Sequence, residues 1–145
     1  CVGFFDIDNL KAVNDIYGHT VGDIVIRAVV RAIREIIRAE DLIFRWGGDE
    51  FFVIMISLDS TTANSRMSRM EKMLSNVRVE GVKQPFRIGV SHAFENFANL
   101  NDLEATIQRA DAGMYQQKAL KKGLADKKQS VFDDALTQTP VLVGK

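Results

Sequence analysis

Residues 45–51 read Arg45-Trp46-Gly47-Gly48-Asp49-Glu50-Phe51, between two apolar runs at 42–44 and 51–56. Two β-prone runs joined by a short glycine-containing segment are typical of a β-hairpin. Glycine supplies the positive φ angles of a tight connection and lets a ligand approach the backbone closely. Adjacent carboxylates at such a tip, on strands too apolar to be exposed, indicate a metal site. Taken alone, an ordinary surface turn remains the alternative.

A second acidic cluster follows the short apolar strand expected at 2–6. Asp6-Ile7-Asp8-Asn9 come directly after Val2-Gly3-Phe4-Phe5. Ligand sites in open sheets gather where strands end, and Mg²⁺ prefers oxygen ligands, usually with only one or two protein carboxylates. Asp6 beside Asp49 and Glu50 would form such a site. Asp8 or Asn9 can also be interpreted as the N-cap of the helix that follows.

The polar residues after Asp6 complete a longer pattern. The chain carries Asp6-x-Asp8-x-x-Lys11-x-x-Asn14-Asp15-x-x-Gly18-His19-x-x-Gly22-Asp23, and downstream of it Arg45-x-Gly47-Gly48-Asp49-Glu50-Phe51. With these two ordered motifs the chain strongly resembles the GGDEF-domain family, the diguanylate cyclases, from about Val2 to about Phe132.

The resemblance implies an α/β (α+β) fold, with a central, mostly antiparallel β-sheet flanked by helices, as in nucleotide cyclases and polymerase palms. It also implies an activity. Two domains, each with one GTP, meet in an antiparallel homodimer, and each 3′-hydroxyl attacks the α-phosphate of the other GTP. The products are cyclic di-GMP and two pyrophosphates. The implied cofactor is Mg²⁺, two ions per active site, with Mn²⁺ as a possible substitute.

Site roles follow from the resemblance position by position. The implied catalytic residues are Asp49 and Glu50, and the implied metal ligands are Asp6, the Ile7 carbonyl, Asp49 and Glu50. The implied guanine-binding residues are Asn14 and Asp23; the implied phosphate-binding residues are Asn9, Leu10, Lys11, Lys118 and Lys122. Elementary chemistry agrees, since a helix N-terminus attracts phosphate and an amide with a carboxylate matches the guanine edge. Alternatively, Asn14 is a solvent-facing helix residue and Asp23 caps the next helix.

A third motif, Arg38-Ala39-Glu40-Asp41, precedes the hairpin. It is similar to the family's RxxD inhibitory site, so Arg38 and Asp41 are predicted to bind product cyclic di-GMP, with Arg69 or Arg66 as a second arginine. Arginine suits this role because its planar fork binds phosphate and guanine acceptors bidentately. The alternative is a helix that ends in a favourable C-terminal arginine.

The chain departs from the family pattern at both ends. Lys122 stands where the family has arginine, and Gly123 follows this position instead of preceding it. Lysine keeps the charge but loses bidentate geometry. The lysines at 121, 127 and 128 are interpreted as a solvated helix end. Family domains open with a helix before the first strand, so we expect an N-terminally truncated GGDEF domain at 1–133 and a tail or linker at 134–145.

Composition excludes several other classes of protein. The 145 residues contain 19 Lys and Arg and 19 Asp and Glu, so there is no electrostatic case for nucleic-acid binding. One cysteine and no signal segment favour a reducing, cytoplasmic location. No apolar run approaches the roughly 20 residues of a membrane span, so we expect no direct membrane contact from this segment. Sensor or effector domains, or a membrane anchor, would belong to other parts of a full-length chain.

Periodicity predicts strands at 2–6, 42–46, 51–56, 86–91 and 129–132, and helices at about 21–39, 59–76 and 103–121. Met67, Met70, Met73 and Leu74 are expected to face the core, and His92 to be a surface residue at a strand end. The prediction is therefore a diguanylate cyclase with product inhibition. The alternatives are a catalytically inactive GGDEF domain that binds cyclic di-GMP or GTP, and a purely structural dimerisation module.

Overall fold

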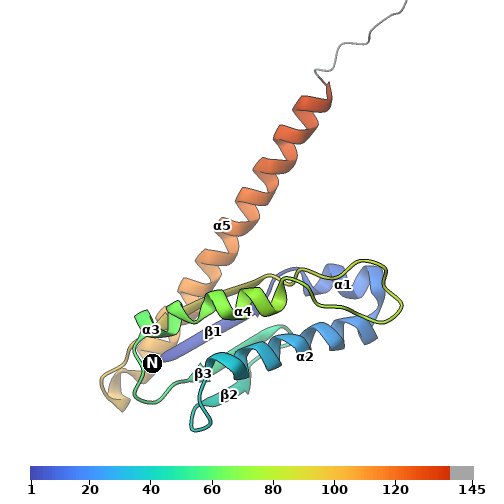
Figure 1. Ribbon diagram of the computed structural model, residues 1–145. Coiled ribbons are helices and arrows are strands. Elements are labelled where there is room, and N and C mark those ends of the chain that lie inside the picture. The colour runs from blue at the N-terminus through green and yellow to red at the C-terminus, as the bar shows by residue number, and fades with distance from the viewer. Residues whose placement is uncertain (138–145) are drawn as a thin grey trace, which may run out of the picture.

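The computed structural model describes the backbone of residues 1–137 and the side chains of residues 1–125. Four strands form one antiparallel sheet in the order β2-β3-β1-β4 (Figure 1). The strands are β1 (Val2–Ile7), β2 (Leu42–Arg45), β3 (Glu50–Ile54) and β4 (Val90–Glu95). The predicted antiparallel sheet is confirmed, and β1 lies at its centre with a partner strand on each side.

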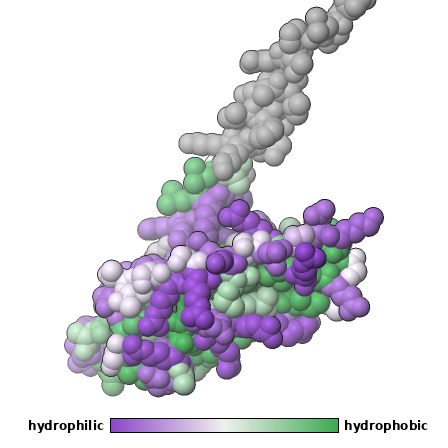
Figure 2. Space-filling model, in the orientation of Figure 1, coloured by the Kyte–Doolittle hydropathy of each residue, from purple (hydrophilic) through white to green (hydrophobic). Residues whose placement is uncertain are grey.

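Helices cover both faces of this sheet. They are α1 (Leu10–Tyr17), α2 (His19–Ile36), α3 (Ser60–Ser65), α4 (Met67–Leu74) and α5 (Leu103–Thr137), with a 3₁₀ turn, η1 (Leu100–Asp102), before α5. Figure 1 shows α2 and α4 in front of the sheet and α5 behind it, with the far half of α5 extending away from the other elements. Space-filling atoms show a largely hydrophilic front, broken by apolar strips between the helices (Figure 2).

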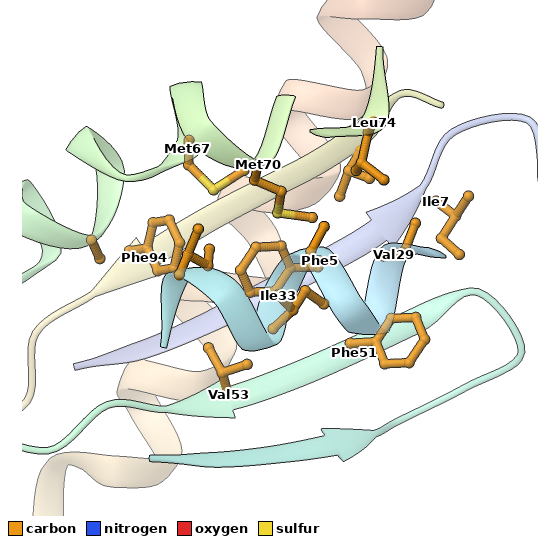
Figure 3. Close-up of a cluster of buried hydrophobic side chains, with 14 of the residues drawn as sticks. Phe5, Ile7, Val29, Ile33, Phe51, Val53, Met67, Met70, Leu74 and Phe94 are labelled. Atoms are coloured by element: carbon orange, nitrogen blue, oxygen red, sulfur yellow. The ribbon is translucent and has the colours of Figure 1, made fainter. Parts of the chain in front are cut away.

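The alternation of side chains along β1 creates two cores. Phe5 and Ile7 point to one face and join the larger cluster under α2 and α4 (Figure 3). Val2 and Phe4 point to the other face and pack with Met114 of α5. Successive strand residues face opposite sides of a sheet, and a strand buried on both faces must be apolar on both. Asp6 also faces the α5 side, at the end of this apolar run.

The apolar stripe predicted for the 21–39 helix is present in α2. The buried residues of α2 are Gly22, Val25, Val29, Ala32, Ile33 and Ile36, which recur at the spacing of one helix face. The arginines at 27, 31 and 34 are exposed on the opposite side. Met67, Met70 and Leu74 of α4 are buried as expected, whereas Met73 is exposed.

Two predicted strands need correction. The strand expected at 86–91 starts only at Val90 and continues to Glu95, because β1 offers partners along its whole length, from Val2↔Glu95 to Ile7↔Val90. Phe86 instead makes an isolated bridge with Val77. The prediction of a strand at 129–132 is wrong, because α5 continues through these residues. Extending an existing helix by one turn costs far less than starting a new element.

The helix also crosses the predicted domain boundary. The limit expected between 133 and 134 falls inside α5, and residues 138–145 of the expected tail lie outside the described part of the chain. Among the described helices, none is both long enough and apolar enough to span a bilayer.

His92 is not the surface residue expected at a strand end. It lies within β4 opposite Phe5, and the two rings stack with centroids 6.3 Å apart. Its Nδ1 is buried, without a hydrogen-bond partner among the described residues. Burial, with the nearby Lys121 charge, lowers the pKa of His92, so the ring favours its neutral form.

Candidate active site at the end of the central strand

Antiparallel pairing brings the two acidic clusters together. Asp6 of β1 lies opposite Glu50 of β3, and the Ile7 amide donates a 3.0 Å hydrogen bond to the Asp49 carbonyl. The hairpin tip is rigidly held, because the Arg45 guanidinium donates to the Gly47 and Gly48 carbonyls at 3.2 and 2.7 Å. Residues separated by more than 40 positions in the sequence therefore share one corner of the sheet.

Asp6 is a buried carboxylate with a cationic partner from the far end of the chain. Its residue is only 3% exposed, and both carboxylate oxygens accept hydrogen bonds from Nζ of Lys118, at 2.6 and 2.7 Å. Burial raises the pKa of Asp6, and the Lys118 bond opposes that rise without cancelling it. Burial by itself would lower the pKa of Lys118, but the Asp6 hydrogen bond together with the charges of Asp6, Asp49 and Asp8 raises that pKa overall. The two short contacts suit a carboxylate facing an ammonium, because each charge stabilises the other.

Glu50 adds a third acidic group to this corner. Burial raises the pKa of Glu50, and repulsion from Asp6 and Asp49 raises it further. Three oxygen-bearing acids whose charges oppose one another suit a hard divalent cation. Within the described residues, no three acidic, histidine or cysteine side chains are arranged to hold a metal ion by themselves. Mg²⁺ needs only one or two carboxylates when phosphate oxygens complete its shell, so this donor set fits a metal–phosphate complex.

A hollow of about 460 Å³ opens beside the acidic corner. Helices α1 and α2 contribute Leu10, Lys11, Asn14, Asp15, His19, Asp23 and Ile26 to its lining, and the hairpin contributes Arg45, Gly48 and Asp49. The predicted guanine-binding residues Asn14 and Asp23 thus share one concave surface with Lys11 and with Asp49. The hollow is formed by the two helices that follow the first acidic motif and by the hairpin that carries the second.

The beginning of α1 leaves its backbone amides without a side-chain cap. Asn9 occupies the N-cap position in a left-handed conformation, with φ 60°, and makes no capping hydrogen bond. The Asp8 carboxylate accepts instead from Ser91 Oγ and Lys121 Nζ. Neither residue acts as the side-chain cap considered from the sequence, so no side chain of these two occupies the first-turn amides, to which an anion could bind.

Helices α1 and α2 pack closely at Gly22, and only a glycine fits at this position. A Cβ added at Gly22 would lie 1.8 Å from Oδ1 of Asn14, so any larger residue would displace the Asn14 side chain. That oxygen is buried and has no hydrogen-bond partner among the described residues. A glycine inside a helix costs stability, and here it leaves room for the Asn14 side chain.

The residues of the RxxD motif do not line the hollow, and they differ from one another in burial and in hydrogen bonding. Asp41 is buried, and its two oxygens accept hydrogen bonds from the amides of Arg38 and Ile56, at 2.7 and 2.8 Å. The Arg38 side chain is exposed, 3.9 Å from Glu40. Arg69 is also exposed and pairs with Glu35 at 2.7 Å, whereas Arg66 donates to the Ile36 carbonyl at 2.6 Å. Asp41 therefore has a structural task at the turn before β2.

The lysines of α5 that contact other elements are not all those predicted from the sequence. Lys121, interpreted from the sequence as solvated, donates to the Val90 carbonyl at 2.7 Å and to Asp8 Oδ2 at 3.1 Å. Lys122 makes no hydrogen bond or ion pair with the side chains and backbone that the structure describes. Lys121 follows Lys118 by three residues, which places both on one helix face. This spacing was the feature of the sequence that could have indicated a contact of Lys121 with other elements.

Comparison with known proteins identifies the family. Residues 1–123 match the model of the diguanylate cyclase GGDEF domain. The chain is 35% identical over 124 residues to the probable diguanylate cyclase DgcT of Escherichia coli K12, which covers 81% of this chain and 27% of DgcT. The chain therefore belongs to the GGDEF family, and the resemblance seen in its motifs is confirmed.

Two further relatives define the comparison. The GGDEF domain of DgcB from Caulobacter crescentus, solved in complex with c-di-GMP, superposes with a TM-score of 0.74 at 27% identity, covering 82% of this chain and 71% of that one. The cyclic di-GMP phosphodiesterase PdeR of E. coli K12 is 34% identical over 125 residues, 81% of this chain and 18% of PdeR. The chain thus spans 27% of the length of DgcT and 18% of the length of PdeR.

The raised pKa of Glu50 predicts a stabilising substitution. The folded state binds the Glu50 proton more tightly than the unfolded state, whose pKa is near 4.5. The ionised carboxylate therefore opposes folding above the folded-state pKa, and this penalty disappears as the pH falls below 4.5. We expect Glu50→Gln to raise the melting temperature at pH 7, with a gain that shrinks towards pH 4.

Thermal unfolding at a series of pH values measures this effect. Glu80→Gln is the matched control, because Glu80 is exposed and has no ion pair among the described side chains. An unchanged or lower melting temperature for Glu50→Gln at pH 7 would contradict the repulsion inferred among the three acids.

Proposed function

We propose that this domain is a diguanylate cyclase, which condenses two GTP molecules into cyclic di-GMP and releases two pyrophosphates. The observation that carries the proposal is the continuity of the hollow with the acidic corner. The hollow joins Asn14 and Asp23 to Asp49, and the Asp6–Lys118 pair lies beside the same hairpin. Nucleotidyl transfer requires three features close together: a surface that binds the base, a helix N-terminus that binds phosphate, and carboxylates that can hold a metal ion.

Asn14 and Asp23 would read the guanine base. Guanine presents N–H donors beside a carbonyl acceptor, which an amide and a carboxylate complement. The unpartnered, buried amide oxygen of Asn14 supports this assignment, because such atoms are rare unless they serve a ligand or a water. An adenine edge, with its donor and acceptor exchanged, would leave one of these side chains opposed by a like group.

The triphosphate would lie over the start of α1. The uncapped amides of Asn9, Leu10 and Lys11, the helix dipole and the Lys11 ammonium all favour negative charge there. Lys118 and Lys122 are the further cations assigned to the phosphates. Lys118 has the stronger support, since its ammonium is already at the acidic corner. Incoming phosphate would compete with Asp6 for this lysine.

Asp6, the Ile7 carbonyl, Asp49 and Glu50 would hold Mg²⁺, two ions per site, with Mn²⁺ as an alternative of the same ligand preference. When bound, these ions supply charge neutralisation at the phosphates and make the attacking 3′-hydroxyl more acidic. Asp49 and Glu50 are the catalytic residues, and the rigid hairpin positions them. The hollow beside Asp49 would hold a single GTP, so two copies of the domain must face each other for the reaction to occur.

A GTP- or cyclic di-GMP-binding domain without turnover is the second candidate. PdeR, a phosphodiesterase of which this chain matches only a part, provides one reason to consider it. The short Asp6–Lys118 ion pair provides another, because it occupies the carboxylate on which metal binding depends. In either case sensor or effector domains elsewhere on a longer chain would regulate this domain.

Product inhibition is proposed at Arg38 and Arg69, with Asp41 beside them. The exposed guanidinium groups of Arg38 and Arg69 support anion binding, since neither has a buried partner to lose. The bonds of Asp41 to two backbone amides suggest that this acid orients the Arg38 backbone, and contacts the product only if these bonds rearrange.

GTP turnover in the presence of Mg²⁺ tests the main proposal. We expect the full chain to form cyclic di-GMP and pyrophosphate, and Asp49→Ala to reduce the rate by at least about 100-fold, because a charge-stabilising group at the reacting centre is lost. Separation of the products by chromatography measures both. GTP binding without any product, in a protein shown to be dimeric, would favour the receptor.

Gly22→Ala tests the base-reading surface without using turnover. The new Cβ must displace Asn14, so we expect a non-hydrolysable GTP analogue to bind about 10-fold more weakly by calorimetry. Gly123→Ala is the matched control, since a Cβ there meets nothing within 4 Å. Equal affinities of the two variants would remove Asn14 from the guanine site.

Arg38→Ala tests the product site. We expect the inhibition constant for added cyclic di-GMP to rise about 10-fold or more, because a charge-assisted bidentate contact is lost, while the uninhibited rate is unchanged. Initial rates at increasing cyclic di-GMP measure this. Unchanged inhibition would place the product elsewhere.

A further inference from the structure

We propose that Lys121 is a positioning residue for nucleotide binding, which acts through Asp8 on the first turn of α1. This inference rests on the proposed GTP site and adds a residue that none of the site motifs includes. Lys121 touches neither the hollow nor the acids of the corner in the contacts that the structure describes. Its effect on the site would be exerted through the backbone.

Lys121 joins α5 to the ends of two strands. Its ammonium donates to the Val90 carbonyl, at the start of β4, and to Asp8 Oδ2, just after β1. Asp8 and Lys121 are separated by 113 residues, so the contact closes a long loop of the chain. Lys118 makes the corresponding contact one turn earlier, with Asp6. Helix α5 thus secures the β1 end at two successive points.

Asp8 is held from three directions. Its amide donates to the Gly89 carbonyl at 2.9 Å, Ser91 Oγ donates to Oδ1 at 2.6 Å, and Lys121 donates to Oδ2. Gly89 is closely fitted to this arrangement, because a Cβ there would lie 2.6 Å from Asp8 Oδ2. A carboxylate with both oxygens bonded and its own amide engaged has one position available to it.

The held residue directly precedes the proposed phosphate site. Asn9, in the left-handed region, follows Asp8, and α1 begins at Leu10. A displacement of Asp8 is therefore passed to the amides of the next three residues, Asn9, Leu10 and Lys11. Small errors in the position of such groups cost binding and rate steeply. We infer that removing the Lys121 charge would loosen this turn and weaken the grip on the triphosphate.

Substitution of Ser91 distinguishes a positioning role of Lys121 from a direct contact between Lys121 and the nucleotide. Its residue is completely buried, so it cannot touch a nucleotide in the hollow, yet it holds the same carboxylate as Lys121. If Lys121 acts through Asp8, Ser91→Ala must weaken nucleotide binding as well. If Lys121 instead moves to contact phosphate itself, Ser91→Ala leaves the affinity unchanged.

The experiment compares four variants of the full chain: Lys121→Met, Lys121→Arg, Ser91→Ala and the double variant of Lys121→Met with Ser91→Ala. Lys72→Met is the matched control, because Lys72 is an exposed lysine whose ammonium has no partner among the described residues. The affinity for a non-hydrolysable GTP analogue with Mg²⁺ is measured by calorimetry, and KM and kcat separately. Hydrogen exchange of residues 8–14 reports on the turn itself.

We expect Lys121→Met and Ser91→Ala each to weaken analogue binding and raise KM about 5- to 10-fold, with kcat changed less and exchange at 8–14 accelerated. The double variant should be little worse than either single one, since both act on one carboxylate. Lys121→Arg should restore most of the affinity, and Lys72→Met should behave as the unaltered protein. The melting temperature of Lys121→Met should change little, because a half-exposed ion pair contributes little to stability.

Three results would overturn the proposal. The first is an unchanged analogue affinity in Lys121→Met, whatever its hydrogen exchange. The second is weakened binding in Lys121→Met with none in Ser91→Ala, which indicates a direct phosphate contact. The third is failure of Lys121→Arg to restore binding. Absence of GTP binding by the unaltered protein would be a different outcome, since it contradicts the proposed function itself.

Discussion

β1 pairs with β3 on one edge and with β4 on the other, and all six of its residues are buried. The register of this strand determines almost everything at the candidate site. A slip by one residue would turn Phe5 and Ile7 away from the α2 core and point Asp6 into it. An unpaired carboxylate in that core would cost several kcal/mol. Burial of alternate residues on both faces thus holds Asp6 opposite Glu50, where the hairpin tip supplies Asp49.

Electrostatic cost is concentrated at this corner. Burial is the largest cause of the raised pKa values of Asp6 and Glu50, and repulsion adds to it, from Asp49 at Asp6 and from Asp6 and Asp49 at Glu50. Lys118 offsets part of this cost through its ion pair with Asp6. Clustering these acids beside the hollow lowers the stability of the folded domain, and such a loss of stability is common at functional sites. The remote RxxD motif differs from the corner, since Asp41 stabilises a turn while the exposed Arg38 side chain lies 3.9 Å from Glu40.

Sequence patterns predicted much of this arrangement, for identifiable reasons. The hairpin, the first strand and α2 carry strong periodic signals, and the acidic motifs lie at the ends of elements, where ligand sites occur. The patterns failed where several elements compete for one segment. The extent of β4 was decided by its partner β1, and residues 129–132 became helix because α5 was already formed. Lys121 looked like any other lysine at a helix end, because its partner Asp8 is 113 residues away.

The sequence by itself determined the family, the antiparallel hairpin and which acids meet, because local periodicity and motif spacing depend only on neighbouring residues. Only the tertiary structure decided which cation faces which acid and which side chains became structural. Lys118 and Lys121, not Lys122, reach the β1 end because α5 crosses the sheet at one particular rotation. Asp41 satisfies backbone amides because β3 ends beside it. Such contacts depend on the packing of elements far apart in the chain, and no local pattern encodes that packing.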